Sequence, residues 1–332
     1  MKYLRSCRRR ILALLGAAVI LAPLAASAQS AGKLPRVGFL GNSTAALEAN
    51  LVGPFRDGLS ELGYVDGRNI SILYRWAEGD YARLPALIAD LVASKVDVIV
   101  TAGTPAALAV RKVTTSIPLV MVAVGDPVGT GLVRSLARPG GNATGLTSIT
   151  PELEGKRLEL MREVLPKVSR VAVLWNPSNA YQIADKKAVR KAAGALRLPV
   201  VTLAVRVADD LEPAFATILR ERADALLVLA DRVFLHNRQH IIDFAMRNRL
   251  PTMSAYRELA EAGGLMSFGP NYAVMHRQAA SYVDKILKGA KPGDLPIEQP
   301  AKFEFVVNLK AAKALDVAVP QSMLLLADDV IE

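Results

Sequence analysis

The chain has 332 residues, which is too many for one compact core, so two domains are expected. Hydrophobic residues make up 52% and charged residues 22%, and this mixture excludes wholesale disorder and low-complexity classes such as collagen. The formal net charge of +10 by itself favours a nucleic-acid or anionic-surface partner.

Residues 1–28 are typical of a cleavable signal peptide. A basic stretch ending at Arg10 precedes an apolar run from Ile11 to Leu24, and Ala26-Ser27-Ala28 fits the small-x-small cleavage pattern. The apolar run is shorter than the roughly 20 residues that a membrane-spanning helix needs. We therefore expect export, with a periplasmic location for the mature protein.

Removal of this segment changes the charge and the thiol content of the chain. The mature protein would have 304 residues and a net charge of +5, because the segment holds five basic residues and no acidic ones. The only cysteine, Cys7, lies inside the segment, and none stands at the cleavage site, so a lipoprotein is not expected. Disulfides, thiolate metal sites and cysteine nucleophiles are thereby excluded from the mature chain.

Short apolar runs alternate with segments of helical periodicity along the rest of the chain. Strands are predicted at 36–41, 69–75, 97–101, 118–124, 144–147, 170–175, 199–204, 224–230, 251–253, 264–267 and 303–308. Helices are predicted at 45–63, 81–94, 104–113, 153–165, 180–196, 209–222, 233–249 and 271–288. Strands that are apolar throughout are typical of parallel sheets covered on both faces. The predicted fold class is therefore α/β, with two doubly wound Rossmann-like lobes and a central cleft.

An internal repeat supports two similar lobes. Four pairs of segments match in the same chain order, at offsets of 119 to 134 residues: 36–42 with 170–176, 96–100 with 223–227, 117–118 with 250–251, and 145–148 with 264–267. The join between the lobes is expected near 148–152.

Small polar residues gather where predicted strands lead into helices. Ligands of open α/β sheets bind at these corners, where helix N-termini favour anions. Thr104 is expected as a helix N-cap before Pro105, and Asp126-Pro127 repeats that pattern. A single polar corner of this kind is more often a structural helix cap. The hypothesis of a ligand site therefore rests on the whole set of polar corners. The candidate ligand-binding residues from the corners are Asn42, Ser43, Thr44, Thr101, Gly103, Thr104, Asp126, Asn176, Asp231 and Ser267.

Aromatic residues are scarce, and both tryptophans fall at strand ends. Trp76 and Trp175 are candidates for stacking on a flat ligand, although packing on a lobe surface explains them equally well. Tyr256 and Tyr272 are weaker candidates of the same kind.

The usual catalytic and cofactor motifs are absent. No Gly-x-Ser-x-Gly, phosphate-binding loop or dinucleotide fingerprint occurs. His236 and His240 have the spacing of a zinc-binding pair, but Asn237 stands where the general base is needed, which favours a solvated helix face. The basic run 186–197 lacks the aromatic residues of a nucleic-acid platform. We expect no enzyme activity, no cofactor, no metal and no nucleic-acid partner.

Residues 35–330 resemble the periplasmic substrate-binding proteins of ABC transporters, in the branch that includes binders of tryptophan and other aromatic amino acids. The similarity rests on an ordered set of short motifs: 58–64, 67–69, 104–105, 117–118, 126–129, 142–146, 176–177, 267–269, 308–312 and Pro320. It implies a type I binding-protein fold, in which two lobes joined by three crossovers close on the ligand. It also implies that 33–149 with about 270–295 form the N-terminal lobe, and 150–269 with about 296–332 the C-terminal lobe.

The resemblance further implies a function and site roles. The protein is expected to be a monomer that binds a small molecule, an amino acid or an aromatic or anionic solute, and delivers it to an ABC permease in the inner membrane. The ligand carboxylate would lie at the helix that starts with Thr104, and Asp231 would hold a ligand ammonium group. Arg232 departs from the small amide that is usual next to this aspartate, and it would pair with Asp231 or take a second carboxylate. An exported enzyme on the same scaffold, or a ligand-sensing partner of a membrane receptor, are the alternatives.

Overall fold

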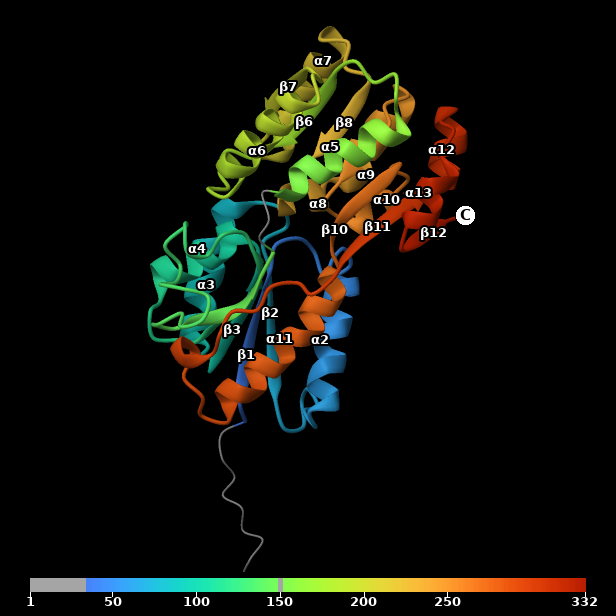
Figure 1. Ribbon diagram of the computed structural model, residues 1–332. Coiled ribbons are helices and arrows are strands. Elements are labelled where there is room, and N and C mark those ends of the chain that lie inside the picture. Colours follow the sequence, from blue (N-terminus) through green and yellow to red (C-terminus); the bar gives the residue numbers. More distant parts are fainter. Residues whose placement is uncertain (1–33, 149–151) are drawn as a thin grey trace, which may run out of the picture. The chain divides into compact units, whose positions relative to one another are not determined.

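The computed structural model describes residues 34–148 and 152–332. Within these residues the strands form two sheets with helices on both faces, which confirms the predicted α/β class with two doubly wound lobes (Figure 1). The predicted signal peptide, residues 1–28, lies outside the described residues. The elements of the two sheets are described in turn below as the first lobe and the second lobe.

The sheet of the first lobe has five described strands, all parallel to their neighbours. In sheet order they are β2 (Ser71–Trp76), β1 (Arg36–Gly41), β3 (Val98–Ala102), β4 (Leu119–Val124) and β5 (Ala143–Thr147). Every residue of β3 and β4 is buried, as expected for strands that have helices on both faces.

Alternate residues of β1 supply the two cores of this lobe. Phe39 points to α2 (Ala49–Glu61) and α11 (Tyr272–Leu287), where its ring centroid lies 5.6 Å from that of Phe55. Leu40 points to α3 (Leu84–Ala93) and α4 (Thr104–Val113) on the other face. Helices α2 and α11 cross closely at Gly58, where a Cβ atom would lie only 2.5 Å from the backbone oxygen of Arg277. A glycine is therefore required at this crossing.

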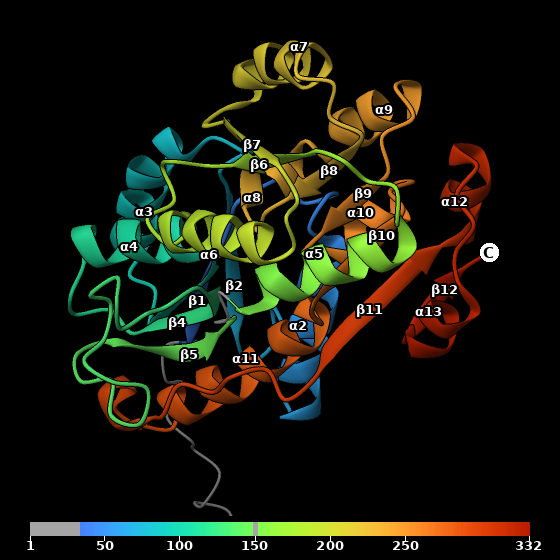
Figure 2. The ribbon, with the colours of Figure 1, turned by 45° about the horizontal axis from the view of Figure 1, so that its top comes forward.

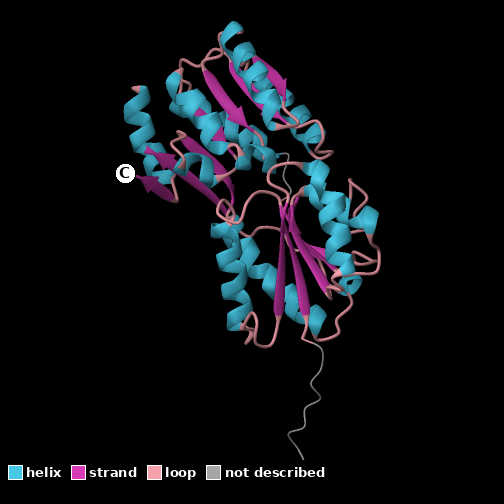
Figure 3. Ribbon diagram, turned by 180° about the vertical axis from the view of Figure 1, so that it is seen from behind, coloured by secondary structure: helices cyan, strands magenta, loops and turns pink. Residues whose placement is uncertain are grey.

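The second lobe has its own sheet, which Figure 3 shows from behind. Seven strands of this sheet are described. In sheet order they are β12 (Asp329–Ile331), β11 (Phe303–Asn308), β10 (Met266–Pro270), β9 (Thr252–Ser254), β8 (Ala225–Val228), β6 (Val171–Trp175) and β7 (Val200–Ala204). Only the β10–β11 pairing is antiparallel among those described, and β11 is the long red strand of Figure 2.

Two helix layers cover this second sheet. One consists of α5 (Glu152–Val164) and α6 (Gln182–Ala195), which pack on Val171 and Val173 of β6. The other includes α7 (Leu211–Arg220) and α9 (Arg238–Arg247), which share a core with Ala172 and Leu174. The remaining elements are short: α8 (Arg232–His236), α10 (Arg257–Glu261), α12 (Leu309–Leu315), α13 (Gln321–Leu326), η1 (Tyr81–Arg83), η2 (Ala208–Asp210) and η3 (Pro292–Asp294).

The internal repeat is confirmed by the strand order. The first sheet runs β2-β1-β3-β4-β5, and β7-β6-β8-β9-β10 of the second sheet follow the same order. Residues matched by the repeat even make the same contact: Arg36 N donates to Asp97 Oδ2 at 2.7 Å, and Arg170 N donates to Asp224 Oδ1 at 3.0 Å. The two sheets are thus built on one plan, and the second carries β11 and β12 in addition.

The chain returns to the first lobe after β10. Helix α11 packs on α2 and on β3 to β5, and residues 297 and 298 still bond to Leu136 and Gly145 of the first lobe. Strand β11 then adds to the second sheet. The first lobe is therefore completed by a helix that lies more than 100 positions beyond its last strand.

One expected helix was wrong, and four short elements were not predicted. The segment 233–249 was expected as one helix, but it breaks at Asn237, whose side chain donates to Val233 O at 2.8 Å and ends α8. Asparagine side chains compete in this way with helical backbone hydrogen bonds. The short elements α10, α12, α13 and β12 were not predicted, because they are too short to show a period.

Candidate functional site

A small cavity lies between the two lobes, at the carboxyl ends of strands from both sheets. The first lobe lines it with Tyr81, Gly103, Thr104, Pro105, Ala123, Gly125 and Ser148. The second lobe and the start of α11 line it with Asn179, Tyr181, Ala230, Asp231, Arg232, Tyr256 and Tyr272. We call this space the inter-lobe cavity. Its position is the one at which open α/β sheets bind ligands.

The first-lobe wall is the N-terminus of α4. Gly103 is the N-cap residue and has φ +81°, a conformation that favours glycine, and Thr104 is the first helical residue. The prediction that Thr104 is the N-cap is therefore wrong. Its hydroxyl instead accepts from Gly125 N at 3.1 Å and donates to Gly125 O at 3.3 Å, which ties α4 to the end of β4. The positive end of the α4 dipole consequently faces the cavity.

Asp231 is a fully buried carboxylate with four protein donors. Oδ1 accepts from Asn176 Nδ2 at 3.0 Å, Val233 N at 3.0 Å and Tyr81 OH at 3.1 Å, and Oδ2 accepts from Asn179 Nδ2 at 2.9 Å. The bond to Val233 N caps α8. Burial raises the pKa of Asp231, and these hydrogen bonds oppose that rise. The carboxylate is thus held in place by its own protein.

Arg232, the residue after Asp231, is also buried, with 3% of its surface exposed. Its Nε and Nη2 atoms have no hydrogen-bond partner among the described residues. The guanidinium carbon lies 5.4 Å from the ring centroid of Tyr256 and 5.3 Å from that of Tyr272, within the range of cation–π attraction. A buried guanidinium with free donors is costly to maintain.

Four tyrosines give the cavity an aromatic character: Tyr81, Tyr181, Tyr256 and Tyr272. The rings of Tyr256 and Tyr272 are 4.9 Å apart and tilted by 44°. Burial raises the pKa of Tyr272 to about 12, so its phenol is neutral at physiological pH. A Cβ atom at Gly125 would lie 2.2 Å from the Tyr181 ring, so the first lobe needs a glycine there to accept this ring.

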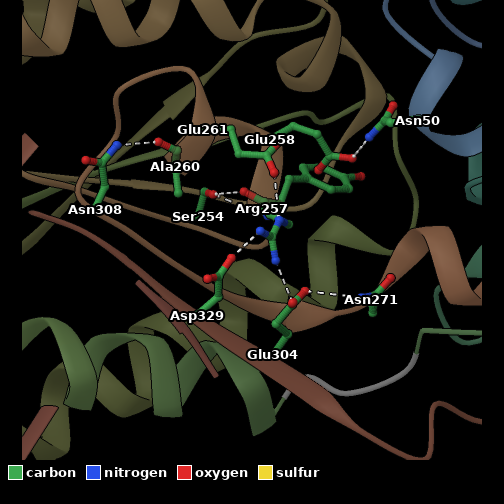
Figure 4. Close-up of polar contacts among 11 residues, drawn as sticks. Asn50, Ser254, Arg257, Glu258, Ala260, Glu261, Asn271, Glu304, Asn308 and Asp329 are labelled. Atoms are coloured by element: carbon green, nitrogen blue, oxygen red, sulfur yellow. Dashed lines mark hydrogen bonds and ion pairs between the residues drawn. The ribbon is translucent and has the colours of Figure 1, made fainter. Parts of the chain in front are cut away.

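Direct polar contacts join the lobes around the cavity. Ser43 Oγ lies 2.7 Å from His236 Nδ1, and Tyr81 OH donates to Asp231. Asn50 Nδ2 donates to Glu258 Oε1 at 2.7 Å, as Figure 4 shows. Ser43 and Asn50 lie in the segment after β1, and Tyr81 lies in η1 after β2, so two segments of the first lobe take part in the contact between the lobes.

Of the twelve predicted site residues, the structure places Gly103, Thr104 and Asp231 on the cavity wall. Three more support the corners: Thr101 donates to Leu40 O, Asn42 donates to Ala102 O, and Asn176 holds Asp231. Ser43 makes the contact between lobes. Ser267 is buried inside β10.

The remaining four predicted residues, Thr44, Trp76, Trp175 and Asp126, also lie outside the cavity wall. Thr44 accepts a bond from Leu47 N. Trp76 stacks on Tyr74 with centroids 5.9 Å apart, and Lys186 Nζ lies 3.4 Å from the ring centroid of Trp175. Surface packing therefore accounts for both tryptophans.

Asp126 does not cap a helix as expected, because the described chain after β4 forms a turn there. Its Oδ1 accepts from Gly129 N at 2.7 Å, within that turn, and its φ is +28°. The Asp-Pro dipeptide is compatible with either a turn or a helix start, and no helix follows in this part of the chain.

Tyr81 and Tyr181 are cavity residues that sequence reasoning missed. Both lie outside the corners that directly follow strands, Tyr81 in η1 and Tyr181 just before α6. The only sequence signal for them is that aromatic residues are scarce in this chain. That signal does not separate cavity tyrosines from tyrosines in the core.

The two histidines of the zinc-like spacing separate, because Asn237 breaks the helix between them. His236 faces Ser43, whereas His240 Nε2 lies 2.8 Å from Glu212 Oε1. Residues 34–148 and 152–332 contain no cluster of side chains that could hold a metal ion. No helix in the same ranges is long and apolar enough to cross a bilayer.

Comparison with known proteins decides the family. The family model for ABC transporter substrate binding proteins matches residues 43–331. The chain belongs to this family. This substrate-binding protein is 29% identical to the tyrosine-binding protein of Clostridioides difficile strain R20291 over 262 residues, which are 79% of this chain and 75% of that protein.

Solved structures agree with this assignment. A conserved domain protein from Vibrio cholerae is 29% identical, with a TM-score of 0.84, and covers 90% of this chain and 100% of its own. An ABC domain from Streptococcus pneumoniae, solved with L-Trp, is 27% identical, with a TM-score of 0.83 and the same coverage. The type I binding-protein fold and the substrate-binding class of this protein are thereby established.

Proposed function

We propose that this protein captures a small organic solute in the inter-lobe cavity and delivers it to an ABC permease in the inner membrane. The solute class is an amino acid or an aromatic or anionic compound of similar size. The observation that carries the proposal is the wall of the cavity, where a helix N-terminus of one lobe faces a buried charged and tyrosine-rich surface of the other. The names of two relatives, which refer to tyrosine and L-Trp, support the same class.

The same geometry supports capture by closure. A ligand that touches both walls stabilises the state in which the lobes meet, since only that state offers both sets of contacts. The contacts of Ser43 with His236 and of Asn50 with Glu258 form part of that state. Exclusion of water then strengthens every charged contact inside.

Export and delivery are further parts of the proposal. The pattern of residues 1–28 and the family match support an extracytoplasmic, periplasmic protein. We propose that the mature protein acts as a monomer, since one chain supplies both walls of the cavity. We also propose that the solute leaves chemically unchanged, because the relatives are binding proteins rather than enzymes.

The direct experiment is identification of the bound solute. The mature protein is purified, denatured and its released small molecules are identified by mass spectrometry. Each solute is then titrated back in a thermal-shift assay, where a ligand that binds only the native state raises Tm. Recovery of unchanged solute supports binding, and turnover of the solute would show an enzyme instead.

Delivery needs a second measurement. Uptake of the labelled solute is compared in cells with and without this gene. Loss of uptake in cells without the gene, restored when the wild-type protein is supplied, supports transport. Undiminished uptake together with loss of a response to the solute would assign the protein to a sensing system.

A further inference from the structure

Two arginines of the second lobe are equally buried but differently bonded. Arg157 is 3% exposed, pairs with Glu154 through Nη1 and donates from Nε to Phe268 O at 2.7 Å. Arg232 is also 3% exposed, but neither its Nε nor its Nη2 has a partner among the described residues. Arg232 lines the inter-lobe cavity, and Arg157 does not. The free donors of Arg232 are therefore available to a molecule in that cavity.

The N-terminus of α4 lies against the same side chain. A Cβ atom on Gly103 would lie 3.6 Å from Arg232 Cγ and 3.9 Å from Arg232 Nε, so the arginine crosses from its own lobe to the first lobe. The positive end of the α4 dipole and a full positive charge thus converge on one place. Such convergence is unfavourable unless an anion lies between them.

The carboxylates that act electrostatically on Arg232 do not bond to its free donors. These carboxylates belong to Glu48 and Glu258, and Arg232 Nε and Nη2 have no hydrogen-bond partner among the described residues. Glu48 Oε1 accepts from Asn42 N at 2.8 Å and Ser43 N at 2.7 Å, and Glu258 Oε1 accepts from Asn50. Both carboxylates are oriented by other contacts.

The group expected to hold a ligand ammonium is occupied. All four contacts of Asp231 come from the protein, and one of them, from Tyr81, crosses between the lobes. Oδ1 already has three donors, so a ligand ammonium could approach only Oδ2, beside the Asn179 amide. The unpartnered polar groups of Arg232 therefore favour an anion in the cavity, whereas Asp231 already accepts four hydrogen bonds from the protein.

From this we infer that Arg232 and the N-terminus of α4 together hold the carboxylate of the ligand, and that an ammonium group on the ligand is dispensable. The inference rests on the proposed function and narrows its solute class to carboxylic acids, with or without an amino group. The planar guanidinium suits this role because it pairs with a carboxylate through two parallel hydrogen bonds. The faces of Tyr256 and Tyr272 fix its position.

The test uses two matched series of three compounds in isothermal titration at neutral pH. Each series contains an amino acid, its carboxylate-free amine and its ammonium-free acid: L-tyrosine, tyramine and 3-(4-hydroxyphenyl)propanoate, then L-tryptophan, tryptamine and indole-3-propanoate. In at least one series we expect the acid to bind within about tenfold of the amino acid. We expect the amine to bind about 30-fold more weakly or worse, because it leaves Arg232 unpaired.

Variants assign the effect to the arginine. Arg232→Met should weaken acid binding by about 30-fold or more, and Arg232→Lys should restore part of it. The ligand-free Arg232→Met protein should melt at or above the wild-type temperature, since it removes an unpaired buried charge. Arg157→Met is the matched control and should melt several degrees lower, because it leaves Glu154 and Phe268 O without their donor.

The outcomes separate this inference from the proposed function. Equal binding of amine and amino acid, unchanged acid affinity in Arg232→Met, or a clear fall in its ligand-free Tm would overturn the inference and leave solute capture intact. If none of the six compounds binds, the test is the chemical structure of the co-purified solute. A solute with a carboxylate supports the inference, and a solute without one contradicts it. A wild-type protein that binds no solute at all contradicts both.

Discussion

Ser43 Oγ and His236 Nδ1 lie 2.7 Å apart and join the corner after β1 in the first lobe to the end of α8 in the second. Burial and, to a smaller extent, the positive charge of Arg238 lower the pKa of His236 from 6.5, and Glu78 opposes this shift. The contact between the lobes therefore favours the neutral imidazole.

The first prediction concerns pH. Because the joined lobes lower the pKa of His236, protonation favours their separation, and ligand affinity should be full above pH 6.5. It should fall as the pH drops below that value and level off below the lowered pKa. Titration calorimetry between about pH 7.5 and pH 5 measures this. His236→Gln should give a flatter profile, and an unaltered profile in that variant would refute the assignment.

The second prediction concerns Gly79. A Cβ atom there would lie 2.6 Å from His236 Cδ2, so Gly79→Ala should push the lobes apart and weaken ligand binding by about tenfold. Gly67→Ala is the matched control, since Gly67 has nearly the same φ, +81° against +79°, and nothing within 4 Å of its Cβ position. Both variants should lose about 1 kcal/mol of folding stability for the backbone conformation. Equal affinities in the two variants would contradict the prediction.

The third prediction concerns a buried carboxyl group in α6. Burial and the neighbouring Glu154 raise the pKa of Asp185 well above its usual 3.8, against the opposing effects of Arg157 and Tyr181. Because the folded state favours the protonated form, the free energy of unfolding should fall as the pH rises above 3.8. Asp185→Asn should therefore be more stable than wild type at pH 7, by about 1 kcal/mol or more, and equal to it near pH 4.

Urea denaturation at the two pH values measures this difference. Asp209→Asn, at an exposed carboxyl, should give wild-type stability at both. A loss of stability at pH 7 in Asp185→Asn would show that the ionised carboxylate is the form used in the fold.

The fourth prediction concerns Arg257. Its guanidinium bonds to Glu261 on α10, Glu304 on β11 and Asp329 on β12, as drawn in Figure 4. The side chain is 36% exposed, so Arg257→Met should cost only about 1 kcal/mol. Hydrogen exchange should nevertheless increase selectively in β12, the edge strand that loses its side-chain contact.

The control for Arg257 is another arginine of similar exposure. Arg75→Met removes a single ion pair with Asp90, at 31% exposure of the arginine, and should leave exchange in β12 unchanged. Uniform exchange across the second sheet in Arg257→Met would show that the cluster has no local role.

The sequence predicted the strands well, because their physical cause is local. The runs at 36–41 and 303–308 were correct to the residue, because both are mainly apolar and most of their residues are buried in the sheet. The helix 233–249 was predicted without its break, because the side-chain bond of Asn237 to Val233 O leaves no trace in the hydrophobic period.

The cavity wall was harder to predict, because it depends on contacts between distant segments. Gly103, Thr104 and Asp231 were predicted from the polar residues at strand-to-helix corners, and the structure places all three on the wall. The position of Tyr81 there depends on its bond to Asp231, which lies 150 residues away in the chain. The state of Arg232 depends on which of its neighbours are already bonded, and no sequence pattern reports that.

The close crossing of α2 and α11 at Gly58 also sets the order in which the molecule can be finished during synthesis. All five described strands of the first lobe have been made by residue 147, yet the apolar face of α2, with Leu51, Phe55 and Leu59, stays uncovered until α11 ends at residue 287. By then the second lobe already has every strand from β6 to β10. The first lobe therefore cannot bury this helix face until most of the second lobe has been made, and until then the exposed face needs protection from aggregation.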